Sequence, residues 1–158
     1  MTGYANKIYC LLKEQKLSLC MAESATGGLL SHLMTNINGV SEVFLGGVCT
    51  YANSAKESLL GVSEIDLKNY GAVSEPVVRQ MALGACQLFQ ADLSLCDTGI
   101  AGPTGGSNEK PVGLFYLAVC WKGKVTVKRH IFKGDRASIK EHAALTALQF
   151  LGEILENR

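Results

Sequence analysis

Apolar runs of strand length alternate with segments of helical periodicity through most of the chain. Short apolar runs, which are typical of buried strands, occupy residues 17–22, 43–51 and 92–100. Apolar residues recur at helical intervals in segments 4–14, 29–37, 53–60 and 75–89. Two further runs, 113–121 and 125–132, predict a β-hairpin, and a long helix is expected over 137–155. This order predicts an α/β fold with a mixed β-sheet and helices on both faces.

Local signals place several helix boundaries. Asn53 is expected to cap the helix that follows the second strand, and Gly61 is expected to end it. Residues 62–73 are expected to form a short connection. Pro76 then suits the first turn of the next helix.

The length and charge of the chain restrict the class of protein. At 158 residues it is expected to form one domain, residues 1–158. The 15 basic and 14 acidic side chains are spread along the sequence and leave a net charge of +1, so no nucleic acid partner is expected.

No apolar run reaches the ~18 residues of a membrane span, and the first residues lack the apolar core of a signal peptide. We therefore expect a cytoplasmic protein without a membrane partner, and its 47% hydrophobic content favours a homo-oligomer.

The cysteines do not form a recognisable ligand pattern. All 6 lie far apart, mostly inside apolar runs, and no CxxC pair or Cys/His spacing typical of zinc occurs. We interpret them as reduced core residues. No metal site and no cofactor are predicted.

A polar turn, ESATGG, joins the first strand to the next helix and is a candidate substrate-binding segment. It runs from Glu23 to Gly28, and a turn at a helix start aims unpaired backbone N–H groups at one point, which favours an anion. Gly27 and Gly28 allow close approach of a ligand, and Ser24 or Thr26 can add a hydroxyl donor. The alternative is that Ser24 or Thr26 is only a helix cap.

A second glycine-rich loop, GIAGPTGG, follows the third strand. Its candidate ligand-binding residues are Gly99, Gly102, Thr104, Gly105 and Gly106. Flexible N–H donors in such a loop can surround a phosphate, although the loop matches neither a P-loop nor a dinucleotide-binding motif. A long surface turn is the alternative. Both loops follow strands, and ligands of open α/β sheets gather beyond the carboxyl ends of the strands.

Ser41, Tyr51 and Lys56 are candidates for nucleophilic catalysis without histidine. A lysine whose pKa is lowered by burial can deprotonate a serine hydroxyl, and a tyrosine can relay the proton. By spacing alone, these three are also an ordinary turn serine, strand-end tyrosine and helix-surface lysine.

Five segments together resemble one family. They are AESATGG at 22–28, GGVCTYANSAKESLLGV at 46–62, GAVSEPVV at 71–78, TGIAGPTGGSNEKPVG at 98–113 and FKGDR at 132–136. In this order and spacing they resemble the CinA C-terminal domain family, which includes stand-alone nicotinamide-nucleotide amidases. The resemblance implies a three-layer α/β/α sandwich. It also implies hydrolysis of a small-molecule nucleotide, nicotinamide mononucleotide, to nicotinic acid mononucleotide and ammonia.

The resemblance also implies roles for single residues. Ser41 corresponds to the nucleophile, Lys56 to its base and Tyr51 to a proton relay, while Arg136 lies near the substrate. Ser24 is the second candidate nucleophile. Which glycine loop holds the phosphate and which forms the oxyanion hole stays open.

Two departures from the family pattern limit what is carried over. Ala25 stands where the family often has Cys or Leu, which alters packing. Longer family members carry an N-terminal domain that acts on pyrophosphate bonds, so activity on ADP-ribose is not expected of this sequence. The alternative function is a catalytically silent module that binds a nucleotide or recruits a partner. Metal-dependent hydrolysis is disfavoured because no ligand cluster is visible.

Overall fold

A five-stranded mixed sheet forms the centre of the structure, a computed structural model that describes residues 2–157. Its strand order is β2 (Phe44–Cys49), β1 (Leu19–Glu23), β3 (Leu93–Gly99), β4 (Leu114–Trp121) and β5 (Lys124–Ile131). β1 runs parallel to both of its neighbours, whereas β3, β4 and β5 pair antiparallel. The predicted mixed sheet is confirmed.

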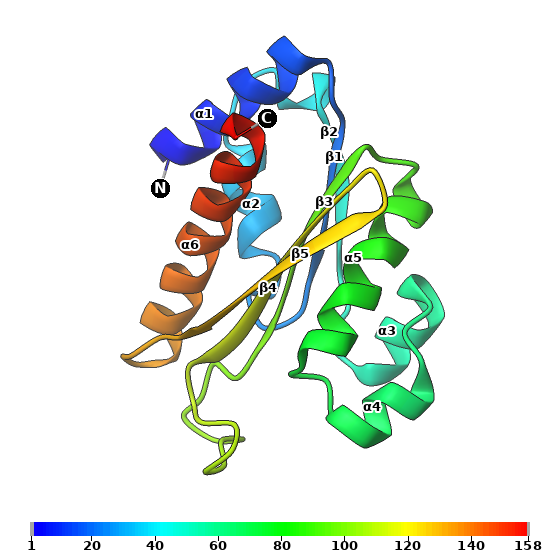
Figure 1. The fold of residues 1–158 in the computed structure, drawn as a ribbon. Helices are drawn as coiled ribbons and strands as arrows, with labels where there is room; N and C mark the ends of the chain where they lie inside the picture. Colours follow the sequence, from blue (N-terminus) through cyan, green and yellow to red (C-terminus); the bar gives the residue numbers. More distant parts are fainter. Residues whose placement is uncertain (1, 158) are drawn as a thin grey trace.

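Helices cover both faces of this sheet (Figure 1). One layer contains α1 (Thr2–Gln15), α2 (Leu29–Thr35) and α6 (Arg136–Glu156). The other contains α3 (Asn53–Leu60), α4 (Glu64–Tyr70) and α5 (Glu75–Phe89). A short 3₁₀ helix, η1 (Val40–Glu42), precedes β2. The fold is therefore the expected three-layer α/β/α sandwich.

Two hydrophobic cores lie on either side of the sheet because strand side chains alternate between its faces. Leu19, Met21 and Leu95 belong to the core under α1, α2 and α6. Cys20 and Cys96 belong to the core under α5. The strands β1 and β3 are buried on both faces, which explains why their sequences are apolar runs without alternation.

The structure differs from the sequence expectations in one additional helix and at the N-cap of another. α4 occupies part of the segment that was expected to be a connection, and its N-cap, Ser63, accepts a hydrogen bond from the N–H of Asp66 at 3.3 Å. This helix is only 7 residues long and buries Leu67 alone, so it has too little periodicity to be recognised. The N-cap of α3 is Ala52 and not Asn53, and it makes no side-chain capping bond.

None of the helices between residues 2 and 157 is long and apolar enough to cross a membrane.

Candidate active site

Two buried carboxyl groups lie side by side at the carboxyl ends of β1 and β3. The parallel register pairs Ala22 with Cys96, which makes Glu23 and Asp97 the next residues on the two strands. Glu23 is 1% exposed and Asp97 is 0% exposed. This is the edge of the sheet at which ligands bind in open α/β folds, and the long loop after β3 and the start of α6 lie at the same end (Figure 1).

Glu23 anchors the turn that follows it. One carboxylate oxygen accepts hydrogen bonds from Thr26 Oγ1 at 2.7 Å, from the N–H of Gly28 at 2.9 Å and from the N–H of Leu30 at 3.0 Å. The other accepts from the N–H and the hydroxyl of Ser31, at 2.8 and 2.7 Å. The carboxylate thus satisfies the free N–H groups at the start of α2 and places a negative charge there, where the helix dipole favours it.

Asp97 holds the same turn from the neighbouring strand. Its carboxyl group accepts from the N–H groups of Ser24 at 3.3 Å and Thr26 at 3.2 Å, and it also lies within hydrogen-bonding distance of Thr26 Oγ1, whose single proton Asp97 and Glu23 share. Burial raises the pKa of Asp97 to about 6, against the hydrogen bond from the Thr26 side chain, and the nearby charge of Glu23 adds to the rise. Asp97 therefore changes protonation close to neutral pH.

These bonds correct the expected role of the ESATGG turn. The turn was predicted to present unpaired N–H groups to an anion, but Glu23 and Asp97 already accept from Ser24, Thr26 and Gly28. The predicted cradle is therefore occupied by the chain's own carboxyl groups, and this part of the prediction is wrong. Neither carboxyl group takes the N–H of Ala25.

Lys56 is the buried base candidate of the site. Its side chain comes from α3, is 1% exposed, and donates hydrogen bonds to Ser24 Oγ at 3.0 Å, to the Thr50 carbonyl at 2.7 Å and to the Tyr51 carbonyl at 3.2 Å. No ion pair in the described part of the chain includes it. Burial lowers the pKa of Lys56, while the charges of Asp97 and Cys49 act in the opposite direction.

The three partners of Lys56 fit both protonation states of the amine, since an ammonium group can donate to all three. A neutral amine has two N–H groups and one lone pair, and two of the partners are carbonyl oxygens that can only accept. The lone pair then remains for the Ser24 hydroxyl, which can donate to it. Ser24 and Lys56 are thus arranged as a nucleophile and its base.

Ser41 lies elsewhere, which corrects the predicted cluster with Tyr51 and Lys56. It is an exposed residue of η1 and precedes β2, whereas Tyr51 and Lys56 follow the other end of that strand. β2 has 6 residues, which span roughly 20 Å at the usual rise per residue of a strand. The serine that contacts Lys56 is Ser24, the second candidate.

Arg136 joins Tyr51 to the glycine-rich loop. Its guanidinium donates to the Tyr51 hydroxyl at 2.9 Å and to the carbonyl of Gly102 at 2.7 Å. Arg136 begins α6 directly after its N-cap, Asp135. The Tyr51 side chain is 60% exposed, so it lies at the mouth of the site and not inside it.

Packing explains most glycines of the loop after β3. A Cβ on Gly99 would come within 2.4 Å of the Phe115 ring, and one on Gly102 would come within 2.4 Å of Val112. A Cβ on Gly106 would meet Val112 as well. Thr104 and Gly105 are exposed. The role of this loop in binding a ligand stays a prediction.

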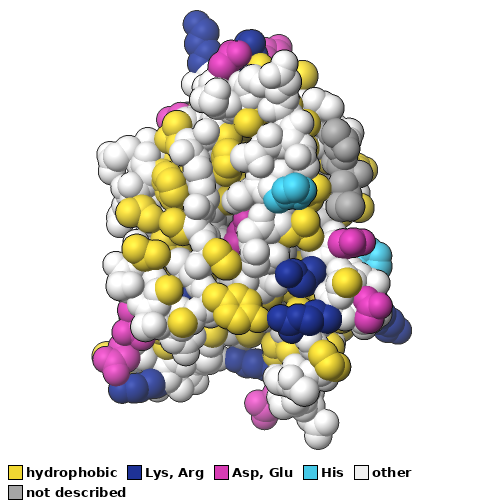
Figure 2. Space-filling view, turned by 180° about the vertical axis from the view of Figure 1, so that it is seen from behind, with side chains coloured by type: hydrophobic (Ala, Val, Ile, Leu, Met, Phe, Trp, Pro, Cys, Tyr) yellow, Lys and Arg dark blue, Asp and Glu magenta, His cyan; other side chains and the backbone are white. Residues whose placement is uncertain are grey.

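An open groove of about 500 Å³ lies beside the ESATGG turn, between α2 and α6. Lys140 of α6 reaches the turn, since its Nζ is 3.4 Å from the position that a Cβ on Gly27 would take. The lining residues are Thr26, Gly27, Gly28, Leu29, His32, Ala137, Lys140 and Glu141. Figure 2 shows Lys and Arg side chains gathered beside hydrophobic ones on the face seen from behind, with a histidine nearby.

Between residues 2 and 157, no group of His, Cys, Asp or Glu side chains is placed to hold a metal ion.

Sequence reasoning missed Asp97 and Lys140. The sequence contains a signal for Asp97: it is the one charged residue in the buried strand LSLCDTG, and a buried charge is costly unless it has a specific role. Lys140 is one of several charged residues on α6, and only the contact with the turn distinguishes it.

Sequence comparison connects this arrangement to a known family. Residues 1–155 match the CinA C-terminal domain. The chain belongs to the CinA C-terminal domain family. A CinA-like protein of Thermotoga neapolitana is 47% identical over 148 residues, which are 94% of this chain and 36% of that protein. The chain thus spans about a third of the length of the curated relatives it matches.

Solved structures of the CinA superfamily share the fold. A CinA superfamily protein from Klebsiella pneumoniae is 30% identical and superposes with a TM-score of 0.96, covering 99% of this chain and 98% of that one. The competence/damage inducible protein CihA from Agrobacterium tumefaciens is 39% identical, with a TM-score of 0.95 and coverage of 99% and 95%.

Proposed function

We propose that the chain hydrolyses the carboxamide of nicotinamide mononucleotide, giving nicotinic acid mononucleotide and ammonia, with Ser24 as nucleophile and Lys56 as its base. The observation that carries this proposal is the 3.0 Å contact between Lys56 Nζ and Ser24 Oγ. The amine is buried, forms no ion pair with any residue between 2 and 157 and has a lowered pKa, which are the conditions for a lysine base. The substrate follows from the resemblance of the sequence to the nicotinamide-nucleotide amidases.

The reaction has two chemical stages. Lys56 takes the proton of Ser24 while Oγ forms a bond to the carboxamide carbon. Lys56 then returns that proton to the amide nitrogen, the C–N bond breaks and ammonia leaves. Water attacks the resulting ester in the same way, again with Lys56 as base, and frees the carboxylate product and Ser24. No metal or redox cofactor takes part in this sequence of steps.

The N–H of Ala25 is our candidate oxyanion donor. It directly follows the nucleophile, and neither Glu23 nor Asp97 uses it. Glu23 and Asp97 hold the turn on either side of it, so the donor is fixed before the charge develops, which is how backbone N–H groups stabilise an oxyanion.

Tyr51 and Arg136 would act at the mouth of the site. Because the Tyr51 hydroxyl accepts from Arg136, its own proton is free for a substrate or for ammonia as it leaves. Arg136 fixes the positions of Tyr51 and of the Gly102 carbonyl and adds positive charge.

The groove between α2 and α6 is the better place for the nucleotide phosphate. Glu23 and Asp97 engage the N–H groups of Ser24, Thr26 and Gly28 in the ESATGG turn, whereas Lys140 lines the groove and brings positive charge to it. A phosphate there would be held mainly by side chains.

Incubation with nicotinamide mononucleotide tests the proposal. We expect ammonia and nicotinic acid mononucleotide to form in equal amounts, measured by a coupled ammonia assay and by chromatography of the nucleotides. The control is the same protein with nicotinamide alone, which lacks the phosphate. Thermal stabilisation by the nucleotide without any product would reject the amidase and favour a silent binding module.

The activity should rise with pH because only neutral Lys56 accepts the serine proton. Burial lowers the pKa of Lys56, so the midpoint of the alkaline rise in kcat should lie below the ~10.4 of an ordinary lysine. In Lys56→Arg the guanidinium stays protonated, so the residual kcat should no longer rise toward alkaline pH. If the unmodified chain and Lys56→Arg had the same pH profile, Lys56 would not be the base. Circular dichroism must show that the variant is folded.

A further inference from the structure

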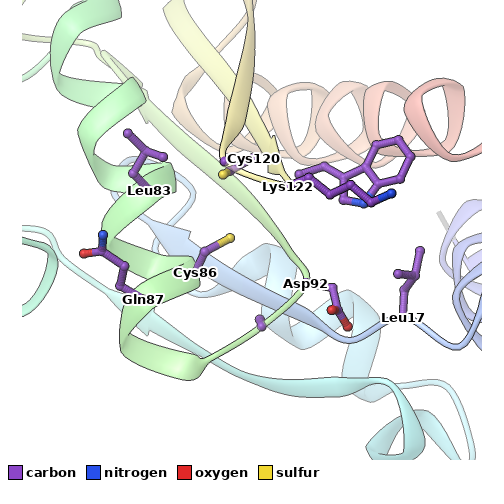
Figure 3. Close-up of a pocket in the computed structure, with 10 residues that line it drawn as sticks. Leu17, Leu83, Cys86, Gln87, Asp92, Cys120 and Lys122 are labelled. Carbon is purple, nitrogen blue, oxygen red and sulfur yellow. The ribbon is translucent and has the colours of Figure 1, made fainter.

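A second cavity, of about 360 Å³, lies at the opposite end of the sheet from Ser24. It is bounded by the residues that precede β1 and β3, by α5 and by the turn between β4 and β5. Figure 3 shows that Cys86 enters it from α5 and Cys120 from β4, with Asp92 and Lys122 as the charged side chains nearby. The proposed amidase chemistry uses none of these groups.

The two cysteines belong to a larger group of thiols on one face of the sheet. Cys20, Ser94 and Cys120 are register partners across β1, β3 and β4, so they form one row beneath α5. Cys86 lies on α5 above this row, and Cys96 follows Ser94 on the same face of β3, with its sulfur 3.9 Å from Ser94 Oγ. Three strands and a helix thus bring four thiols together.

Among these four thiols, Cys86 alone combines partial exposure with a lowered pKa. The Cys20 side chain is the largest cause of a lowered pKa for Cys86, with smaller contributions from Ser94 and Cys120, while burial and the charge of Asp92 act in the opposite direction. Cys86 is also half-buried, whereas Cys20 and Cys120 are buried. Burial raises the pKa of Cys96, which makes that thiol inert.

We propose that Cys86 and Cys120 form a reversible disulfide when a peroxide enters this cavity. In the first step the Cys86 thiolate attacks one oxygen of the peroxide, the O–O bond breaks, and hydrogen peroxide yields a sulfenic acid and water. In the second step the Cys120 sulfur attacks the sulfenic sulfur, and a second water leaves. Two electrons pass from the thiols to the peroxide, and a dithiol reductant reverses the change.

Cys120, and not Cys20, is the resolving thiol because it can be reached from the cavity. Both influence the pKa of Cys86, but only Cys120 lines the cavity together with it, and Figure 3 shows Cys86 on α5 and Cys120 on β4 at the same cavity. Cys20 is 0% exposed on the central strand β1 and serves as a hydrogen-bond donor to Cys86, which raises its own pKa.

The test uses the full chain with Cys10 and Cys49 replaced by serine, because these two thiols are exposed and would be oxidised independently. After treatment with hydrogen peroxide, we expect the intact mass to fall by two hydrogen atoms. Two fewer thiols should react with an alkylating reagent in denaturant, and dithiothreitol should restore both. Chymotrypsin can separate Cys86 from Cys120, since Phe89 and Tyr116 lie between them, so a linked peptide pair identifies the bond.

Matched variants in the same background distinguish the pairings. Cys86→Ser should leave the other three thiols reduced, and Cys96→Ser should leave the link intact. A link from Cys86 to Cys20, overoxidation of Cys86 without any link, or four thiols that stay reduced would each overturn the proposal. The mapping in the chain with all four cysteines does not depend on the folding of these variants, and no readout depends on amidase activity.

Discussion

Replacing Ser24 by alanine is expected to lower kcat/KM for nicotinamide mononucleotide by about 10⁴-fold or more, because the attacking oxygen is lost. The fold should survive. Lys56 keeps its two carbonyl partners, Thr50 and Tyr51, and the turn keeps its bonds to Glu23 and Asp97. Ammonia release measures the activity, and thermal unfolding checks that the variant is folded.

Ser41→Ala is the matched control for this experiment. Ser41 is exposed on η1, at the other end of β2 from Lys56, so its removal should leave kcat/KM within about twofold of the unmodified chain, as for most surface substitutions away from a site. A large loss of activity in Ser41→Ala together with a functional Ser24→Ala would reverse the assignment of the nucleophile.

The sequence was sufficient for the architecture because strand and helix periodicities repeat over many residues. The runs around Met21, Leu95 and Leu117 are long enough to identify buried strands, and the β-hairpin turn at Gly123 is explicit. The short helix α4 was missed because one buried residue, Leu67, gives no periodicity. A helix or strand is therefore easier to recognise from the sequence when it buries more side chains.

The site could be predicted only in part, since it depends on which ends of the strands meet. Lys56, Tyr51 and Arg136 were identified as candidates, and the structure brings the first to Ser24 and joins the other two to each other. Ser41 was wrongly placed in the cluster because its role was taken from the family resemblance, although the strand predicted over 43–51 already separates it from Lys56. The ESATGG turn was misjudged for a different reason: its N–H donors are satisfied by Asp97, a residue 71 positions away from Thr26.

The site has two parts: the buried carboxyl groups of Glu23 and Asp97 support the turn, and Ser24 and Lys56 form the reactive pair. Glu23 and Asp97 place their charge against the N–H groups of the turn, so they hold Ser24 without contacting Lys56 by a hydrogen bond. Lys56 therefore has neither carboxyl group as a hydrogen-bond partner, although the charge of Asp97 raises the pKa of Lys56 against the effect of burial. The site thus combines a rigid acidic support with a lysine whose pKa is lowered by burial.

Replacing Glu23 by alanine is expected to lower the free energy of unfolding by about 3–5 kcal/mol, the usual cost of removing one partner of a buried charged interaction, because five buried or partly buried donors lose their acceptor. The affected groups are the N–H groups of Gly28, Leu30 and Ser31 and the hydroxyls of Thr26 and Ser31. Part of the loss is recovered because Asp97 no longer faces a second negative charge. Denaturation by urea, followed by circular dichroism, measures the change.

Two variants show which property of Glu23 matters. Glu23→Gln keeps one carbonyl oxygen as acceptor but turns an NH₂ group toward part of the donor set, so its loss should be about half that of Glu23→Ala. Glu42→Ala removes an exposed glutamate that pairs with Lys13, and it should cost less than about 1 kcal/mol. If Glu23→Ala unfolds at the same urea concentration as Glu42→Ala, the carboxylate does not support the turn. Ser24 would then be positioned by Asp97 alone.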